Sequence, residues 1–194
     1  MRALVVYCHP NPDSLVAAAR DRVLAGLAAA GHETRLLDLY AEGFTPELTA
    51  EERDAARESE LAPELRRSVE HLRWAEALVL VYPTWWSGQP AMLKGWIDRV
   101  WGAGLGSDMR RAPGFASRLV TGIRRIAIVT THGSPKWTNA LEGEAGKRTA
   151  FRSVRVACGR RVRTSWTAIY GLDRADEAKR IAWLDRVEER FRGF

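Results

Sequence analysis

The sequence predicts an α/β fold: a doubly wound parallel sheet of five strands in the order 2-1-3-4-5, with helices on both faces. Short apolar runs alternate along the chain with amphipathic segments of helical period, which is the pattern of βα units. The runs are continuously apolar, as in strands that are covered on both faces. A chain of 194 residues suffices for one well-packed domain. We therefore expect a single domain over residues 1–194.

Composition narrows the class of protein. Hydrophobic residues make up 46% of the chain and charged residues 28%, as in soluble globular proteins. No apolar run is long enough to cross a bilayer, and the apolar part of the amino terminus is too short for a signal peptide. We expect a cytoplasmic protein without stable membrane insertion. Cys8 and Cys158 have no metal-like spacing, so we expect free thiols and no metal site.

The basic residues leave the chemistry of a partner open. The net charge is +6, and the densest cluster of arginines lies between Arg148 and Arg163. A solvated face is the favoured interpretation, and nucleic acid is not expected, because no basic motif with aromatic interleaving accompanies the cluster. An anionic small molecule is the third interpretation.

The first βα unit begins with residues 2–7, a short apolar run that predicts a buried strand. A turn-rich loop over residues 8–14 follows, in which Asp13 or Ser14 can cap the next helix. Gly31 ends that helix. The unpaired N–H groups of its first turn would make a seat for phosphate. A plain capped turn explains the same loop equally well.

The second unit begins with a strand over Glu33–Leu39 and an irregular stretch over Tyr40–Pro46. Two polar helices follow, over Thr49–Glu58 and Pro63–Trp74. We expect a break between them at Ala62, because the residue before a proline disfavours the helical conformation. The residues expected to face inward on the second helix are Leu65, Val69 and Leu72.

The third unit is the most informative part of the chain. Residues 78–81 predict a strand buried on both faces, and a polar loop bracketed by Pro83 and Pro90 follows at once. Ligands bind where such strands end in an open α/β sheet. The next helix carries apolar residues at the spacing i, i+3, i+4, i+7 and i+8. They are Leu93, Trp96, Ile97, Val100 and Trp101.

Two adjacent tryptophans, Trp85 and Trp86, lie in this third loop. Indole rings often serve core packing or a subunit contact, because they carry a large apolar surface. The pair lies in a polar loop that contains glycine, however, and not on the helical stripe. A flat aromatic ligand is therefore the favoured interpretation.

The fourth unit opens with Gly102–Gly122, which lacks periodicity and predicts a long surface loop. Arg125–Thr131 is the next buried strand, and it runs directly into a polar loop over residues 132–139. Gly133 and Ser134 can offer backbone N–H groups at close range in this loop.

The fifth unit consists of a helix over Phe151–Cys158, a strand over Val162–Tyr170 and an amphipathic helix over Ala175–Phe191. The residues expected to face inward on the last helix are Ala178, Ile181, Leu184, Val187 and Phe191.

Three strands, ending at Tyr7, Tyr82 and Thr131, run directly into the polar loops that carry the unusual chemistry. With the order 2-1-3-4-5, the first two loops flank the topological switch point, and the third lies beside them. They offer a helix amino terminus for phosphate, indole walls for a flat ring and backbone donors for ring heteroatoms. A flavin meets all three demands.

At these residues the sequence resembles the flavodoxin-like NAD(P)H:quinone oxidoreductases and the related flavoproteins that accompany potassium-efflux systems. The resemblance covers most of the chain. It is specific in HisProAsnProAspSer, in ProThrTrpTrp followed by GlyGlnProAlaMetLeuLysGlyTrpIleAspArgVal, and in ThrThrHisGlySer. It implies FAD, or FMN as the alternative, with hydride passing from NAD(P)H to a quinone-like acceptor. It also implies a homodimer, whose interface the Trp96 and Trp101 stripe could serve.

The resemblance assigns cofactor-binding roles to residues of all three loops. Those near the flavin phosphates are His9, Ser14 and Leu15. Those lining the isoalloxazine are Pro83, Thr84, Trp85 and Trp86. Those at its polar edge are Thr131, His132, Gly133 and Ser134.

One departure from the family concerns the third of these loops. Some members carry a tyrosine and a histidine further along it, whereas this chain has Trp137 and no histidine after His132. Either His132 or only backbone donors would then steady the charge of the reduced flavin. His132 is the candidate catalytic residue, as a charge or proton partner, because histidine titrates near neutral pH. The expected mechanism is two successive hydride transfers, for which the protein supplies orientation and a shielded face.

Two alternatives keep the fold and change the function. An electron-carrying flavodoxin would bind flavin without oxidising NAD(P)H, although such proteins tend to be acidic and this chain is basic. A regulatory subunit of a transporter would hold flavin as a ligand and act through its partner.

Overall fold

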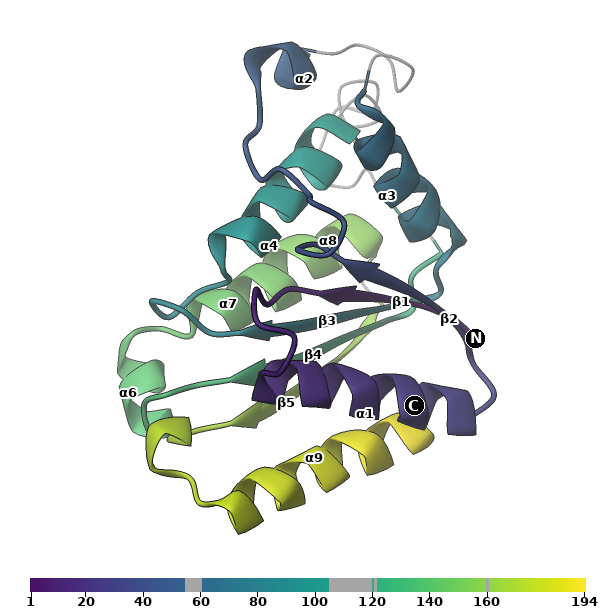
Figure 1. The fold of residues 1–194 in the computed structure, drawn as a ribbon. Helices are drawn as coiled ribbons and strands as arrows, with labels where there is room; N and C mark the ends of the chain where they lie inside the picture. Colours follow the sequence, from purple (N-terminus) through teal and green to yellow (C-terminus); the bar gives the residue numbers. More distant parts are fainter. Residues whose placement is uncertain (55–60, 105–119, 121, 160) are drawn as a thin grey trace.

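The computed structural model describes residues 1–54, 61–104, 120, 122–159 and 161–194. Within them the chain forms one five-stranded sheet in the order β2-β1-β3-β4-β5, with every neighbouring pair parallel. The predicted fold class and strand order are confirmed. Figure 1 shows the sheet between two layers of helices.

The strands are those that the apolar runs predict. β1 and β3 are almost wholly buried, which is why their sequences are continuously apolar. β5 lies at one edge of the sheet and is largely half-buried. The bounds are Arg2–Tyr7 for β1, Glu33–Asp38 for β2, Ala77–Pro83 for β3, Arg125–Thr131 for β4 and Arg163–Ile169 for β5.

Helices α1 (Leu15–Ala29) and α9 (Glu177–Arg192) cover one face of the sheet. The other face is covered by α3 (Pro63–Trp74), by α4 (Ala91–Ile97) and by the helical stretch that ends in α8 (Arg155–Cys158). Each layer encloses its own apolar core. The peripheral elements are α2 (Ala50–Asp54), α6 (Lys136–Leu141), α7 (Ala145–Arg148) and a short 3₁₀ turn at Leu172–Arg174.

Local chemistry sets both ends of α1. The Ser14 side chain accepts a hydrogen bond from the Ala17 backbone N–H at 3.1 Å, so Ser14 is the N-cap. At the other end Gly31 has φ +70°, and the His32 N–H donates to the Leu27 carbonyl at 3.0 Å. This closure requires the left-handed backbone that glycine adopts most easily. The expected cap and stop are both confirmed.

Two helices differ from the prediction on the α4 side of the sheet. The helical stretch expected over Phe151–Cys158 already begins at Ala145. Its first buried residues, Gly146 and Ala150, are small, so the sequence offered no large apolar residue to mark these turns. Segment 132–139, expected to be a loop, contains the start of α6, a short helix after Pro135 that lacks an apolar period.

The last helix buries a different stripe from the expected one. Val187 and Phe191 are buried as predicted, together with Trp183, but Ala178 and Ile181 are exposed. α9 packs chiefly along α1, so it buries a narrow line of residues spaced by four.

The long loop expected over Gly102–Gly122 is only partly covered by the structure. The helix that begins with α4 continues as a π-helical stretch over Asp98–Gly104, so the first residues of the expected loop are helical. Val120 is buried, and residues 105–119 and 121 lie outside the described part of the chain. The end of the helix expected over Thr49–Glu58 also lies outside it, beyond α2.

The apolar stripe from Leu93 to Trp101 is buried in the core of its own subunit. Trp96 is wholly buried and Trp101 is 7% exposed. These residues pack against α3 and the sheet. The expectation that Trp96 and Trp101 serve a subunit contact is wrong, because the single chain already buries both.

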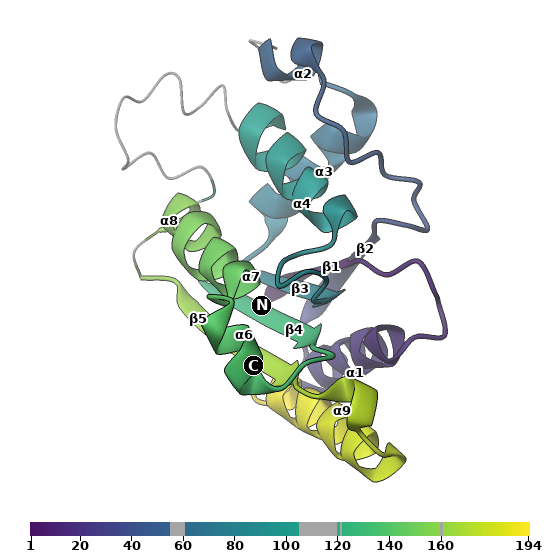
Figure 2. The same ribbon diagram turned by 90° about the vertical axis from the view of Figure 1, so that its left-hand side faces the viewer.

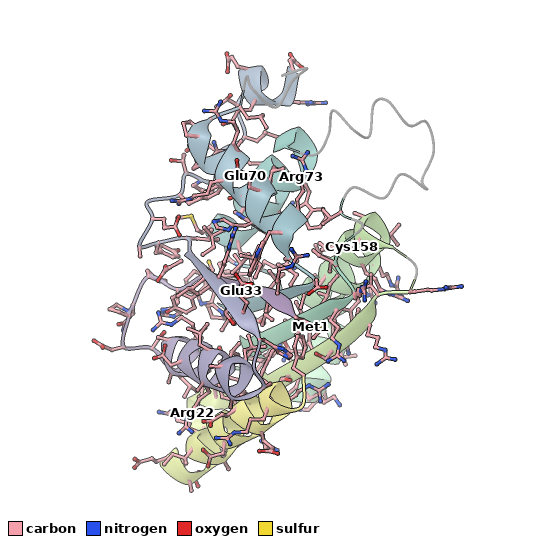
Figure 3. The ribbon with its side chains drawn as sticks, turned by 90° about the vertical axis from the view of Figure 1, so that its right-hand side faces the viewer. Met1, Arg22, Glu33, Glu70, Arg73 and Cys158 are labelled. Carbon is pink, nitrogen blue, oxygen red and sulfur yellow. The ribbon has the colours of Figure 1, made fainter. Side chains whose placement is uncertain are left out.

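One glycine sets the distance between α1 and α9. A Cβ on Gly26 would lie 2.6 Å from the carbonyl oxygen of Glu188 and 2.7 Å from the Cβ of Phe191. Close by, Arg22 of α1 forms ion pairs with Glu188 at 2.7 Å and with Asp185 at 3.4 Å. Figure 3 shows Arg22 on α1, next to α9.

Replacing Gly26 by alanine should lower the free energy of unfolding by about 1–3 kcal/mol, because two packed helices would have to separate. Urea denaturation measures this quantity. The matched control is Gly102→Ala, at a helical glycine whose added Cβ would meet nothing within 4 Å. An equal loss of stability in both variants would contradict the close-packing explanation.

Candidate functional site

The three predicted loops meet at the edge of the sheet where β1, β3 and β4 end. The His9 ring, after β1, lies 5.9 Å from the Trp85 ring, after β3, measured between ring centroids. The Thr84 N–H donates to the Thr131 carbonyl at 2.8 Å, which joins the loop after β3 to β4. Figure 2 looks onto this edge, with α6 and α7 beside it. Segments far apart in the sequence therefore form one site.

The loop after β1 is organised by short side-chain bonds. The Asn11 N–H donates to Nδ1 of His9 at 3.0 Å, and the Asp13 N–H donates to the Asn11 side chain at 2.8 Å. Nδ1 of His9 also lies 3.1 Å from the Asn11 carbonyl oxygen, so both backbone groups of Asn11 face this nitrogen. Nε2 is the ring nitrogen that Asn11 does not engage, and it lies in the loop beside the amino end of α1. Leu15, the first residue of α1, is half-buried and has an N–H that no helical carbonyl reaches.

The loop after β3 contains a tight turn of high backbone energy. Trp85 and Gly88 exchange two backbone hydrogen bonds, at 3.0 and 3.2 Å, around Trp86 and Ser87. Those two residues have φ +47° and +60°. Such a turn favours Asn and Gly at these positions, and a bulky residue there costs about 1–2 kcal/mol. Backbone strain of this kind is concentrated at functional sites.

The turn holds an indole ring in solvent. Trp86 is fully exposed at 102%, and Trp85 is 41% exposed. Core packing therefore does not explain Trp86, and only part of Trp85 is covered by the protein. Pro83 is buried at the end of β3 and fixes the start of the loop. Ser87 donates a hydrogen bond to the Glu142 carboxylate, which ties the turn to the end of α6.

The loop after β4 has little room for side chains. A Cβ on Gly133 would lie 2.7 Å from a carboxylate oxygen of Asp173, so a larger residue there would displace that exposed side chain. The Ser134 carbonyl accepts from the Gly171 N–H at 2.9 Å. Thr131 is 4% exposed. This loop is thus held against the segment that follows β5.

A chain of buried polar side chains runs beneath the loops after β3 and β4. The hydroxyl oxygens of Thr130 and Thr84 lie 3.0 Å apart, and the Thr84 hydroxyl oxygen lies 3.4 Å from Nε2 of His132. Nδ1 of His132 lies 2.7 Å from Oδ1 of Asn139. Buried polar groups of this kind need partners, and here each member has one.

Asn139 determines which atom donates and which atom accepts in the hydrogen bonds of this chain. Its Nδ2 donates to the carbonyl of Pro135 and to Oγ of Ser134, both at 3.0 Å, so Oδ1 is the atom that faces His132. An amide oxygen only accepts, and therefore Nδ1 of His132 carries the proton. Nε2 then accepts from the Thr84 hydroxyl, which in turn accepts from Thr130. The Thr84 hydroxyl thus keeps only a lone pair for the site.

His132 is uncharged at neutral pH. Its side chain is buried, and it stacks on Tyr170 with ring centroids 4.5 Å apart and planes 12° apart. Burial lowers the pKa of His132 below its ordinary value, against the opposing effects of Asn139, Glu144 and Glu142. The cause is desolvation, which disfavours the charged imidazolium. A fixed positive charge at His132 is therefore not available to the site.

The described residues offer neither an activated thiol nor a metal cluster. Cys8 and Cys158 are free and buried, and burial raises the pKa of each thiol to about 12. Thiols of this kind are protonated and unreactive at neutral pH. No group of three or more metal-ligating side chains occurs within the part of the chain that the structure describes. No helix among the described residues is long and apolar enough to span a bilayer.

Comparison with known proteins assigns the chain to a family. The model of a family with the flavodoxin-like fold, Flavodoxin_2, matches residues 1–190. The chain belongs to this Flavodoxin_2 family. The resemblance seen in the three loop motifs is therefore confirmed at the level of the family.

Individual members of this flavodoxin-like family are moderately similar to the chain. A ribosyldihydronicotinamide dehydrogenase-like protein of Penicillium crustosum is 32% identical over 69% of this chain and 58% of its own length. The uncharacterized NAD(P)H oxidoreductase YcaK of Escherichia coli is 37% identical over 54% of each chain. The chain thus spans less than two thirds of either relative.

A solved structure of similar size matches along the whole chain. The NAD(P)H:quinone oxidoreductase of Methanothermobacter marburgensis superposes with a TM-score of 0.82 and 25% identity. The match covers 100% of this chain and 95% of that one.

Sequence reasoning missed Asn139, the residue that orients His132 in this flavodoxin-like chain. Asn139 is 3% exposed and lies in segment 132–139, which was expected to be a polar loop. A spacing of seven residues from His132 does not predict a contact, because the contact depends on the short helix α6 that carries Asn139. Trp137 was noted only as a departure from the family, and its ring is 67% exposed on α6.

Replacing Asn139 by aspartate should raise the pKa of His132, because a carboxylate beside Nδ1–H stabilises the imidazolium. In the parent protein the pKa of folded His132 lies below its ordinary 6.5. The unfolded state therefore binds more protons, and stability from this group is lost as pH falls from about 6.5. The aspartate variant should lose less stability as pH falls over the same range. NMR titration of His132 and urea unfolding at several pH values measure both effects.

Asn139→Leu is the matched control, since it leaves Nδ1–H buried without an acceptor. It should cost about 1–3 kcal/mol of stability. Ring ¹⁵N shifts that place the proton of parent His132 on Nε2 would contradict the deduced tautomer.

Proposed function

We propose that the chain is a flavin-dependent oxidoreductase that passes hydride from NAD(P)H through a bound flavin to a quinone or similar small acceptor. The single observation that carries the proposal is the meeting of three unlike loops at the carboxyl edge of the sheet, through His9, Trp85 and Thr84. Ligands bind at this edge in open α/β sheets. The names of the Penicillium, Escherichia and Methanothermobacter proteins support the same class of reaction.

The residues of the site fit a flavin phosphate at the first loop. The first-turn N–H groups of α1 point out of the helix end, where the dipole is positive. Nε2 of His9, the ring nitrogen that Asn11 does not engage, adds a polar atom from the same loop. We propose that His9, Ser14 and Leu15 hold the phosphate and adjoining groups. The proposed cofactor is FAD, with FMN as the alternative.

The second and third loops fit the flavin ring. A strained turn that keeps Trp86 in solvent costs free energy, and a ligand that stacks on the indole would offset that cost. We propose that the ring is lined by Pro83, Thr84, Trp85 and Trp86. Thr131, Gly133 and Ser134 are proposed to meet its polar edge, and His132 to act on that edge through Thr84.

The flavin, when bound, supplies the hydride chemistry, and the protein supplies position, shielding and protons. His132 is buried, so its proposed proton-partner role runs through the Thr84 hydroxyl that donates to Nε2. Thr84 presents a lone pair to the ring, which suits a flavin N–H group. If His132 takes up a proton at Nε2, the Thr84 hydroxyl can no longer donate to that nitrogen. The hydroxyl must then rotate, and it can donate to the site instead.

We also propose that the protein acts as a cytoplasmic homodimer. Trp86, Trp137 and Leu141 are exposed near the same edge, at 102%, 67% and 80%. Apolar side chains grouped in this way mark binding surfaces, and a second subunit would shield the reduced flavin from water.

The decisive experiment identifies the cofactor and follows its reduction. The purified protein should show a flavin absorption spectrum, and the mass of the extracted ligand should be that of FAD or FMN. Stopped-flow mixing with NADH or NADPH should bleach the flavin, and a quinone should restore it. Flavin that neither nicotinamide reduces would contradict the proposal and favour an electron carrier or a transporter-regulating subunit.

Replacing Trp86 by alanine should weaken flavin binding by about 1–3 kcal/mol, since a stacked aromatic ring is lost. Fluorescence titration of the apoprotein with flavin measures the change. Trp86→Phe is the matched variant and should retain most of the affinity. Unchanged affinity in the alanine variant would remove Trp86 from the ring contact.

A further inference from the structure

One arginine of the cluster seen in the sequence, Arg163, lies beside other arginines in the folded protein. Arg163 is the first residue of β5, so it lies at the amino end of the sheet, opposite the candidate flavin site. Figure 3 faces this amino end, where Met1 lies. The fold brings two further arginines to Arg163 from distant parts of the chain.

Arg125 and Arg163 are direct partners in the parallel pairing of β4 with β5. Both side chains lie on the α1 and α9 face of the sheet, because Val129 and Ile169, an even number of residues further along their strands, pack in the core of that face. Two like charges in register on neighbouring strands repel each other. The pair is therefore unfavourable unless something of opposite charge neutralises it.

Arg190, in the last turn of α9, completes a group of three around one cavity. The cavity has a volume of about 470 Å³. Its lining also includes Ser165, Glu189 and the ring-bearing residue Phe194, whereas the side chain of Ile126 packs in the core of the opposite face of the sheet. The guanidinium of Arg125 lies 5.2 Å from the centroid of the Phe194 ring.

The charges around the cavity do not cancel. Among the described residues, none of the guanidinium groups of Arg125, Arg163 and Arg190 has an ion pair or a hydrogen bond to a side chain. Glu189 is the one carboxylate side chain among the lining residues. The carbonyl end of α9 adds a partial negative charge. Three full positive charges outweigh both, and they leave a net positive charge when the α-carboxylate of Phe194, which also lines the cavity, is counted.

We propose that this cavity, formed by Arg125, Arg163 and Arg190, binds a small phosphorylated molecule. Arginine forks match the geometry of phosphate oxygens, and the hydroxyl of Ser165 lies on the same face of β5 as Arg163. The volume exceeds that of one phosphate group, and the Phe194 ring offers an apolar surface for an organic part.

This site is separate from the proposed flavin site, because it lies at the opposite ends of the strands. Its ligand is therefore an additional molecule, and its test does not depend on hydride transfer.

The experiment is calorimetric titration of the full chain with pyrophosphate and with inorganic phosphate, at constant ionic strength and with saturating FMN. The flavin keeps the loop after β1 occupied. Saturable binding with one site per chain is expected. Arg163→Gln should weaken it about tenfold, the usual effect of losing a charge-assisted hydrogen bond. Arg163→Lys, which keeps the charge, should recover part of the affinity.

Arg180→Gln is the matched control, because Arg180 lies near the start of α9 and does not line the cavity. It should bind pyrophosphate as the parent does. Equal weakening in Arg163→Gln and Arg180→Gln would overturn the proposal, since the effect would then be one of net charge. Absence of saturable binding, or binding only to duplex DNA or to anionic vesicles, would also overturn it.

Discussion

The structure depends above all on the parallel pairing of β1, β3 and β4. Parallel strands all end at the same edge, so the loops that follow them meet even though they are separated by dozens of residues. The pairing is possible because these strands are continuously apolar and helices cover both faces. Anything that disturbs the packing of α1 against α9, such as a side chain at Gly26, therefore acts indirectly on the site.

The second constraint is the satisfaction of polar groups beneath that edge. Thr84, Thr130, His132 and Asn139 are linked in one chain whose hydrogen bonds all point in one direction. A buried imidazole without partners would be costly, and here the cost is limited because both ring nitrogens are engaged. The same burial that makes His132 structural also keeps it neutral. It can thus influence the flavin edge only through Thr84.

The two ends of the sheet differ in chemistry. At the carboxyl end, exposed indoles and backbone N–H groups offer a surface for a flat ring with a phosphate. At the amino end, unneutralised arginines surround a cavity of about 470 Å³. The two ends are joined by the strands of one sheet. β4 is the direct link, since it runs from Arg125 to Thr131.

The sequence by itself determined the fold class and the places where strands end in polar loops, because apolar period, caps and strand ends are local signals. The strand order was a hypothesis that the structure confirms. The sequence wrongly predicted that Ala178 and Ile181 are buried, and it missed that a helix begins at Ala145. Burial at these positions depends on the element packed against them. Only the tertiary structure decided the tautomer of His132 and the grouping of Arg125 with Arg163. Those features arise from contacts between residues on different elements, and periodicity along a single segment carries no information about them.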